Sequence, residues 1–374
     1  MSSIPTTTKT WILANHPKGA ATYSSSDESA TFKLVEQEIP KLGPNQVLVK
    51  TLFLSNDPAQ RVSIESSIPA ERLYAPPVQL QAPMKAGGLG EVIDSTADNI
   101  PKGTIVQAGL SWSEYIVLDA AAASPRKPLP NGLSLTHYLG ALGGPGLTAY
   151  YGLVIIGEAK KGQRIVVSGA AGATGSMVVQ IAKNVSIFFP QPKHETCAEK
   201  DRDEQIVGAS EVIGIAGTDE KCRWVESLGA DKCINYRSKT FEQDLIKATD
   251  GFVDVYFDNV GGETLDIMLG RLKQGGVSIA CGAISNYNAQ QPSVLKNYFQ
   301  VITMRLSIRG FIVLDYAPHF GEVIALFIKS LQEGKLKISD ESEQVVSTPF
   351  ADIPKTWLKL FDGGNTGKLV TKIV

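Results

Sequence analysis

Residues 163–183, QRIVVSGAAGATGSMVVQIAK, decide the fold of this chain. A β-branched run at 165–167 leads into a glycine cluster at 169–175, and apolar residues recur at helical spacing after it. This order predicts a strand, a tight turn and a helix that begins near Ala173. The rest of the chain can be arranged around that unit.

The glycine turn is suited to hold a phosphate. Glycines let the backbone approach a pyrophosphate closely, and the N-terminus of the next helix presents N–H groups and partial positive charge. The residues expected at the phosphate are Gly172, Ala173, Thr174 and Gly175. The spacing is G-x-x-G-x-x-G, with Ala170 in place of the usual first glycine, so a packed turn without a ligand is the alternative.

The composition is that of an ordinary globular protein. The chain has 374 residues, of which 43% are hydrophobic and 20% charged, and a formal net charge of -2. The length suggests two domains, and the charge gives no reason to expect nucleic acid or a membrane as a partner. Absence of a signal pattern and of an apolar run of about 18 residues predicts a cytoplasmic protein. Four cysteines without C-x-x-C pairing fit reduced thiols.

The pattern of elements changes near residue 140. Before it, short alternating runs such as QVLVKTLFLS predict an antiparallel β-domain. After the GGPG break at 143–146, strands expected at 211–215, 253–257, 277–280 and 306–313 alternate with helical stretches, which predicts a doubly wound parallel α/β sheet. The chain returns to short strands near Lys335. We therefore expect a Rossmann domain at 142–335 inserted into a mostly antiparallel domain formed by 1–141 and 336–374.

Nine ordered stretches resemble one family, the zinc-free medium-chain dehydrogenase/reductases, and within it the leukotriene/prostaglandin reductases and plant alkenal double-bond reductases. The stretches are LSNDPAQR, YLGALGGPGLTAYYGL, VVSGAAGATGS, GIAGTDEKCRWVESLGAD, INY, DVYFDNVGGETLD, CGAISNYN, IRGFIV and GGNTGKLV. The resemblance implies a Rossmann domain that binds NADPH, a GroES-like catalytic domain and a homodimer. It also implies metal-free reduction of the C=C bond of α,β-unsaturated aldehydes or ketones.

The choice of cofactor can also be argued from the residues. NAD-preferring sites place an Asp or Glu at the tip of the second Rossmann strand, where it bonds the ribose 2′-OH. Here the tip is AGT at 216–218, and Lys221 follows one helical turn later. Small residues leave room for a 2′-phosphate that Lys221 can neutralise, which favours NADPH; a solvated lysine is the alternative. Asp219 and Glu220 are expected to interact with the helix dipole.

The resemblance also supports Lys221 and implies further cofactor contacts. The matching positions are Lys221, Tyr236, Asn259, Cys281, Gly282, Ala283, Ile284, Ser285, Asn286, Tyr287, Phe311, Ile312, Val313 and Asn365. The predicted strand DVYFDN ends at Asn259, and the carboxyl ends of parallel strands face the cofactor crevice in such sheets. Simple packing is the alternative for Cys281 and Phe311.

No metal site is predicted. Zinc-dependent relatives use a Cys, a Gly-His-Glu segment and a four-cysteine cluster, none of which occurs here, and His16, His137, His194 and His319 lack ligand spacing. Without a Lewis acid the chain is poorly suited to oxidise an unactivated alcohol. Hydride addition to the β-carbon of an enone needs less, because only the enolate oxygen must be stabilised and a proton supplied.

Tyr287 is the candidate for that role. The family places the tyrosine of its AIS-x-Y segment beside the nicotinamide, and the matching residue here is Tyr287. A loop tyrosine that only packs on the cofactor is the alternative. Many relatives carry DPYMR where this chain has DPAQR at 57–61, so Ala59 replaces a substrate-facing tyrosine and leaves the substrate range open.

Two other functions compete with enone reduction. One is an NADPH quinone oxidoreductase with the same cofactor crevice, against which CGAISNYN and FDNVGG argue. The other is a non-catalytic NADPH-binding protein, since folds can be reused without turnover. The complete set of cofactor segments argues against the second.

Residues 185–205, VSIFFPQPKHETCAEKDRDEQ, interrupt the Rossmann pattern. A helix and the next strand are normally joined by about 2–6 residues, and nothing in the family occupies this space. Without the stretch the sequence continues as QIAKNIVGASEVIGIAG. Because its ends can be encoded as splice sites and it preserves the reading frame, we interpret it as a translated intron, with a surface insertion as the alternative. Either way it should lie away from the nicotinamide.

Overall fold

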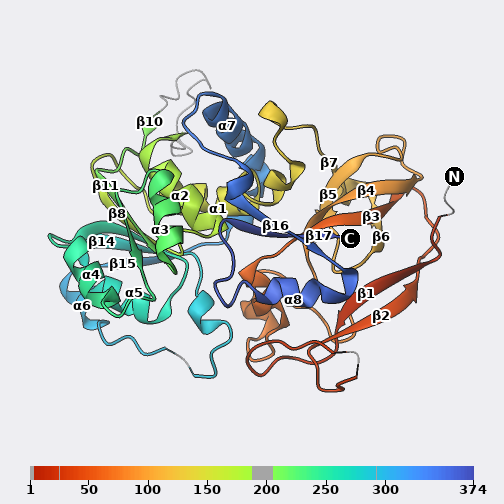
Figure 1. Ribbon diagram of the computed structural model, residues 1–374, viewed down its shortest axis with the longest axis horizontal. Coiled ribbons are helices and arrows are strands. Elements are labelled where there is room, and N and C mark those ends of the chain that lie inside the picture. Colours follow the sequence, from red (N-terminus) through yellow and green to blue (C-terminus); the bar gives the residue numbers. More distant parts are fainter. Residues whose placement is uncertain (1–3, 25, 188–204, 292) are drawn as a thin grey trace. The chain divides into compact units, whose positions relative to one another are not determined.

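The computed structural model describes residues 4–24, 26–187, 205–291 and 293–374. The chain divides into two compact units, a β-unit of Met1–Leu139 with Glu343–Val374 and an α/β-unit of Gly140–Ser342 (Figure 1). The boundaries expected from the sequence were 141/142 and 335/336. Among the described residues no helix is long and apolar enough to cross a membrane.

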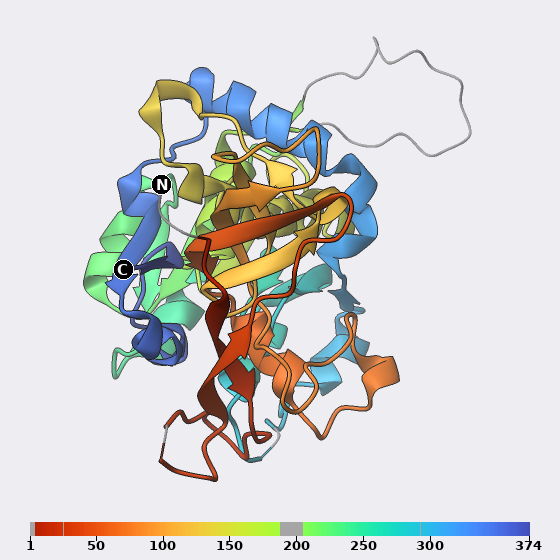
Figure 2. The same cartoon turned by 90° about the vertical axis from the view of Figure 1, so that its right-hand side faces the viewer.

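The β-unit contains a seven-stranded sheet with the order β16-β17-β3-β4-β5-β7, in which β6 also pairs with β3. The bounds are β3 Gln46–Ser55, β4 Gly87–Ser95, β5 Ile105–Gly109, β6 Tyr115–Asp119, β7 Ser124–Pro125, β16 Glu343–Thr348 and β17 Lys368–Ile373. A second sheet pairs β1, Thr7–Leu13, with β2, Phe32–Glu38 (Figure 2). Only β16 and β17 pair in parallel among these strands, so the predicted mostly antiparallel fold is confirmed.

Aromatic packing joins the C-terminal segment to the N-terminal part of the β-unit. Trp357 on α8, Ile353–Leu358, is fully buried, and its ring centroid lies 5.7 Å from that of Trp112. Phe32 packs against Trp112 at 4.9 Å. Large aromatic side chains contribute much of the burial energy of a core. The tail therefore completes the first domain, and the α/β-unit is an insertion between its two segments.

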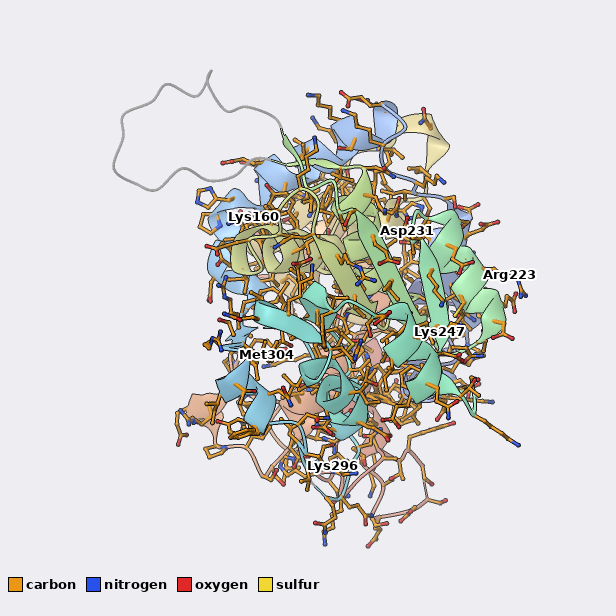
Figure 3. The ribbon with its side chains drawn as sticks, turned by 90° about the vertical axis from the view of Figure 1, so that its left-hand side faces the viewer. Lys160, Arg223, Asp231, Lys247, Lys296 and Met304 are labelled. Atoms are coloured by element: carbon orange, nitrogen blue, oxygen red, sulfur yellow. The ribbon has the colours of Figure 1, made fainter. Side chains whose placement is uncertain are left out.

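The α/β-unit is built on a six-stranded sheet, all parallel, with the order β12-β11-β8-β13-β14-β15 (Figure 3). The strands are β8 Arg164–Ser168, β11 Glu211–Ala216, β12 Lys232–Asn235, β13 Val253–Asp258, β14 Leu272–Ala280 and β15 Ser307–Gly310. The helices are α1 Gly144–Tyr150, α2 Ala173–Lys183, α3 Asp219–Ser227, α4 Phe241–Ala248, α5 Gly262–Leu269, α6 Phe299–Thr303 and α7 Phe320–Gln332. The predicted doubly wound sheet is confirmed.

Helices cover both faces of this sheet. One face buries Tyr256, Val166 and Ile213 against apolar residues of α4, α5 and α6. The opposite face is covered by α3, which packs closely on the sheet at Gly214. An added Cβ at Gly214 would lie 2.7 Å from Val225 of α3. Strand order reverses at β8, between β11 and β13, and ligands of open α/β sheets bind at such a switch point. The glycine turn directly follows β8.

Some predicted elements have different bounds. The strand expected at 306–313 is limited to β15, because residues Val313–His319 form a 3-10 helix that contains Pro318. Tyr151–Ile156 continue α1 as a π-helical turn. Within the described ranges, the other short helices are Pro58–Ile64, Ala70–Arg72, Ala120–Ala122, Pro130–Gly132, Leu135–Leu139, Ile284–Asn286, Asp340–Ser342 and Phe350–Asp352.

The ends of the unusual segment 185–205 pair with each other. Ser186–Ile187 form β9 and Gln205–Ile206 form β10, antiparallel, with Ser186 opposite Ile206. Val185 before this pair and Val207 after it are both buried. These described ends lie between the C-terminus of α2 and the start of β11, at the edge of the sheet opposite the strand carboxyl ends. Residues 188–204 lie outside the described part of the chain.

Candidate functional site

The turn after β8 requires glycine at several positions. Gly169 has a φ of +59°, and a Cβ at Gly175 would lie 2.3 Å from the carbonyl oxygen of Gly169. Gly172 is the N-cap of α2, and no side chain caps the helix. The eleven residues of α2 therefore present an uncapped N-terminus at the switch point. Such a terminus suits a phosphate because its first N–H groups have no intrahelical acceptor.

The tip of β13 is bonded to the tip of β8. The Asn259 side chain donates to the Ser168 carbonyl at 2.7 Å, and the Asn259 backbone N–H donates to Ser168 Oγ at 3.0 Å. Asp258 Oδ1 receives hydrogen bonds from the Tyr256 hydroxyl and from the N–H groups of Val260 and Gly261. Burial raises the pKa of Asp258, and these donors oppose the shift. The network fixes the backbone on which a cofactor at the switch point would rest.

A positively charged cluster lies where the sequence predicts a 2′-phosphate. Burial and then the charge of Arg237 lower the pKa of Lys221, so these two side chains lie close enough to repel. The Arg237 guanidinium carbon lies 5.8 Å from the centroid of the Tyr236 ring. A Cβ at Gly217 would lie 2.9 Å from the Tyr236 hydroxyl, so only glycine fits that tip without displacing the tyrosine. Two cations beside a phenol form a suitable site for a phosphate dianion.

Two acidic residues lie beside this cluster, and of these Glu220 acts on Lys221, whose pKa its charge raises against the larger effect of burial. Asp219 accepts a hydrogen bond from the Asn235 amide at 2.8 Å, and Thr218 caps α3 by accepting from the Lys221 N–H at 3.2 Å. Asp219 and Glu220 lie in the first helical turn, where a carboxylate is stabilised by the helix dipole. Arg237 is a residue of this cluster that was not predicted from the sequence, although it directly follows Tyr236 in INYR.

The loop after β14 packs onto the tip of β13. The N–H groups of Cys281 and Gly282 both donate to the Asp258 carbonyl, and Ser285 bonds the Val260 carbonyl through its N–H and its hydroxyl. Burial raises the pKa of the Cys281 thiol to about 12, so it is protonated at neutral pH. Cys281 therefore contributes small size and a neutral surface rather than a thiolate.

Tyr287 ends this loop with its hydroxyl turned back toward the backbone. The Ala283 N–H donates to the Tyr287 hydroxyl oxygen at 3.3 Å, and a Cβ at Gly282 would lie 3.5 Å from that oxygen. Burial raises the pKa of Tyr287, which keeps the phenol protonated at neutral pH. Because the oxygen accepts from the backbone, its own hydrogen can be donated to another group. The loop thus presents a neutral hydrogen-bond donor beside the switch point.

The remaining predicted contacts are dispersed. Phe311 follows β15 and packs on the π-helical turn, since a Cβ at Gly152 would lie 2.7 Å from its ring; Ile312 caps the 3-10 helix that begins at Val313. Asn365 belongs to the β-unit, where its amide donates to the Gly367 carbonyl at 2.8 Å. Within the α/β-unit the structure brings together the glycine turn, Asn259 and the 281–287 loop, with the Lys221 cluster beyond the tip of β11.

Comparison with known proteins assigns the family. Residues 9–125 match a model described as the N-terminal domain of oxidoreductase, and residues 205–329 match one described as zinc-binding dehydrogenase. Mouse prostaglandin reductase 1 is 32% identical, with 97% of this chain and 98% of the relative covered. Tobacco 2-alkenal reductase (NADP(+)-dependent) is 31% identical, with 97% and 96% covered. The crystal structure of CurA from Vibrio vulnificus in complex with NADPH is 31% identical, has a TM-score of 0.80, and shares 98% and 99% coverage.

The chain belongs to the medium-chain dehydrogenase/reductases. Within them it lies in the branch of the prostaglandin and alkenal reductases, as its nine motifs predict. These enzymes are oxidoreductases, and this chain is one of them.

The family model that matches residues of the α/β-unit is described as zinc-binding dehydrogenase, so the side chains that could hold a metal ion need to be considered. The described residues contain no group of three or more His, Cys, Asp or Glu side chains arranged to hold a metal ion. His16 Nδ1 lies 3.0 Å from the Ile64 carbonyl, and His319 pairs with Glu322 on the surface. His137 is buried against Glu343, and His194 lies outside the described residues.

Proposed function

We propose that this NADPH-dependent reductase reduces the C=C bond of α,β-unsaturated aldehydes and ketones. The observation that carries the proposal is the Tyr287 hydroxyl, held by the Ala283 N–H at the carboxyl edge of the sheet and kept protonated by burial. A donor of this kind stabilises negative charge that develops on a carbonyl oxygen. The tobacco relative, an NADP(+)-dependent 2-alkenal reductase, and the NADPH complex of CurA support the same chemistry.

The residues of this chain fit the cofactor. Bound NADPH would supply the hydride for the β-carbon of the substrate. The glycine turn and the N-terminus of α2 would hold its pyrophosphate, and Lys221 with Arg237 would hold its 2′-phosphate. Asn259 and the 281–287 loop, fixed through Asp258, would position the nicotinamide end.

The same geometry indicates which group stabilises the enolate and which group supplies the proton. As hydride reaches the β-carbon, the carbonyl oxygen becomes an enolate oxygen, and the Tyr287 O–H can donate a hydrogen bond to it. The raised pKa of Tyr287 makes full proton transfer to the α-carbon unfavourable for the tyrosine itself. We therefore assign Tyr287 to stabilisation of the enolate, and water delivers the proton.

The test measures NADPH and NADH consumption against a panel of enals, enones and quinones, with the products identified. We expect the products to be saturated aldehydes or ketones. We also expect the protein to use NADPH in preference to NADH. Turnover of quinones alone would favour the quinone oxidoreductase alternative, and tight NADPH binding without turnover of any acceptor would favour the non-catalytic one. The panel includes bulky enones beside small ones, because Ala59, on the helix Pro58–Ile64, stands where many relatives carry a larger tyrosine.

We also propose that the protein is a cytoplasmic homodimer. β15 is an edge strand, and its Ile308 is 43% exposed; Phe299 and Ile302 on the preceding α6 are 66% and 61% exposed. An edge strand beside exposed apolar side chains is suited to pair with a second copy. Light scattering after gel filtration should give the mass of two chains, and cell fractionation tests the location.

A further inference from the structure

The carboxyl ends of β13, β14 and β15 lie in a row in the parallel sheet. Asp258 of β13 is paired with Ala280 of β14, and Ala280 is paired with Gly310 of β15. The segments that leave these strands therefore start side by side, at the edge where ligands of such sheets bind. The segment after Gly310 is residues 311–313, which lead into the 3-10 helix Val313–His319. The course of this segment decides the shape of the site beside the loop that follows β14.

The π-helical turn Tyr151–Ile156 holds β15 and the first residue after it. The Arg309 side chain of β15 donates to the Ile156 carbonyl, at the end of the turn, at 2.8 Å. A Cβ at Gly152 would lie 2.7 Å from the Phe311 ring, so glycine at this position lets the ring pack against the turn. π-Helical turns are rare, and they occur frequently at functional sites. This turn is therefore bonded to β15 and packed against the residue that leaves it.

Tyr151, the first residue of the π-helical turn, stacks on Tyr316 of the 3-10 helix. Their ring centroids lie 4.3 Å apart, and the angle between the ring planes is 15°. Two further rings pack on Tyr151, that of Tyr150 at 5.4 Å and that of Phe320 of α7 at 6.2 Å. Burial raises the pKa of Tyr151 to about 12, so its ring is uncharged at neutral pH. Tyr151 is thus a fixed platform, and the 3-10 helix rests on it through Tyr316.

The stack fixes the far end of residues 311–313. Phe311 packs on the π-helical turn at the near end, and Tyr316 stacks on the same turn shortly after the segment ends. Between them, the Asp315 N–H donates to the Ile312 carbonyl at 3.2 Å, which ties the start of the 3-10 helix to the segment. Loss of the Tyr316 ring would release one end of the segment and leave the contacts of β15 and Phe311 in place.

We propose that Tyr316 is a positioning residue for hydride transfer. Stacked on Tyr151, it fixes residues 311–313 at the carboxyl edge of the sheet, where the nicotinamide end of NADPH would lie; the inference rests on the proposed function in this respect. The pyrophosphate and the 2′-phosphate would be held elsewhere, by the glycine turn and the Lys221 cluster. A displacement of about 1 Å between reacting groups can slow a reaction on the order of a hundredfold. Tyr316 should therefore affect the rate of hydride transfer more than the affinity for NADPH.

The experiment compares Tyr316→Ala and Tyr316→Phe with the unmodified full-length protein, after thermal melting has shown that each is folded. NADPH affinity is measured by titration, and the mobility of the bound nicotinamide by the fluorescence anisotropy of NADPH, whose reduced nicotinamide is the fluorophore. Hydride transfer is followed in single turnovers with an enone that the unmodified protein reduces. Tyr316→Ala should slow this step about tenfold to a hundredfold and lower the anisotropy, with little change in affinity. Tyr316→Phe should match the unmodified protein, because it keeps the ring.

Tyr298→Ala, at an exposed tyrosine of the same unit, is the matched control and should leave all three measurements unchanged. If Tyr316→Ala does not fold, Tyr316→Leu replaces it with the same expectations, since leucine keeps bulk without the stacked ring. The proposal is wrong if the folded variant keeps both the rate and the anisotropy, or if affinity falls as much as the rate. It is also wrong if Tyr316→Phe is impaired as much as Tyr316→Ala, because the hydroxyl and not the stack would then matter.

The proposed function can fail separately from this inference. An unmodified protein that binds NADPH but reduces no enone would overturn the proposed function. The anisotropy of bound NADPH would then still show whether Tyr316 fixes the nicotinamide end, because that measurement needs no substrate.

Discussion

The Tyr256 hydroxyl donates a hydrogen bond to Asp258 Oδ1 at 2.8 Å beneath the cofactor edge of the sheet, and both side chains are buried. The same oxygen receives the N–H groups of Val260 and Gly261, so the strand interior is linked to the loop that follows β13. Neither residue need touch a ligand. Their pairing determines where the backbone at Asn259 lies.

Tyr256→Phe should destabilise the fold and weaken NADPH binding. A buried carboxylate that loses one donor costs about 1–3 kcal/mol. The pKa of Asp258 is already raised, and loss of a donor that lowers it raises it further. A folded pKa above the unfolded one gives stability that is present at low pH and lost as pH rises through the folded value. The deficit of the variant should therefore be larger at neutral pH than in acid, measured by denaturant unfolding; a deficit that grows in acid would contradict the assignment.

Lys221→Ala and Arg237→Ala should each reduce the preference for NADPH over NADH. Loss of one charge-assisted phosphate contact costs about 1.5–3 kcal/mol, or roughly tenfold to a hundredfold in NADPH affinity. NADH affinity should change little, because it lacks the 2′-phosphate. Arg223→Ala is the matched control, since Arg223 lies on the exposed side of α3 (Figure 3). Equal affinity of the unmodified protein for both cofactors would show that this cluster has another purpose.

Tyr287→Phe should slow the chemical step more than it weakens cofactor binding. The ring is retained while the O–H that would face the enolate oxygen is lost, and removal of one such donor costs about 10²–10³ in kcat when it acts on developing charge. Single-turnover rates with an enone and NADPH affinity are measured together. Tyr298→Phe, at an exposed tyrosine of the same unit, serves as control. An unchanged single-turnover rate would leave stabilisation of the enolate to water.

Some features of the fold and of the candidate site could be predicted from the sequence and others could not, for physical reasons. The α/β order and the glycine turn were predictable because hydrophobic period and glycine spacing are local properties, and Lys221 lies within a helical turn of the strand it serves. Arg237 was not identified, because its approach to Lys221 depends on how α3 packs beside β12. The pairing of His137 with Glu343 joins two distant segments, and nothing local in either marks it.

Glu343→Gln should destabilise the β-unit strongly. His137 Nδ1 lies 3.1 Å from Glu343 Oε1, both side chains are almost completely buried, and the contact is not an aligned hydrogen bond. Removing one member of a buried pair costs about 3–5 kcal/mol. Glu333→Gln, which breaks an exposed pair with Lys335, is the control and should leave the unfolding midpoint nearly unchanged. A small effect of Glu343→Gln would mean that the buried pair contributes little.

Residues 185–205 should be removable without loss of NADPH binding. Ser186 and Ile206 face each other in the antiparallel pair of β9 and β10. Such Cα atoms are about 4.5–5.5 Å apart, close to the roughly 3.8 Å of a direct peptide link. Deletion of 187–205 would join these two positions directly. Deletion of 185–205 places Ile206 after Asn184, so that an isoleucine follows the helix where the buried Val185 now does.

Both deletion variants should retain NADPH affinity and thermal stability close to those of the full chain, because the two ends of the deleted connection lie at the edge opposite the glycine turn. Loss of NADPH binding in a folded variant would contradict that placement. The origin of the segment is a separate question that the transcript and the intact mass of the native protein answer. A native product that lacks these residues supports a translated intron, and one that retains them makes the segment a genuine insertion at the base of the sheet.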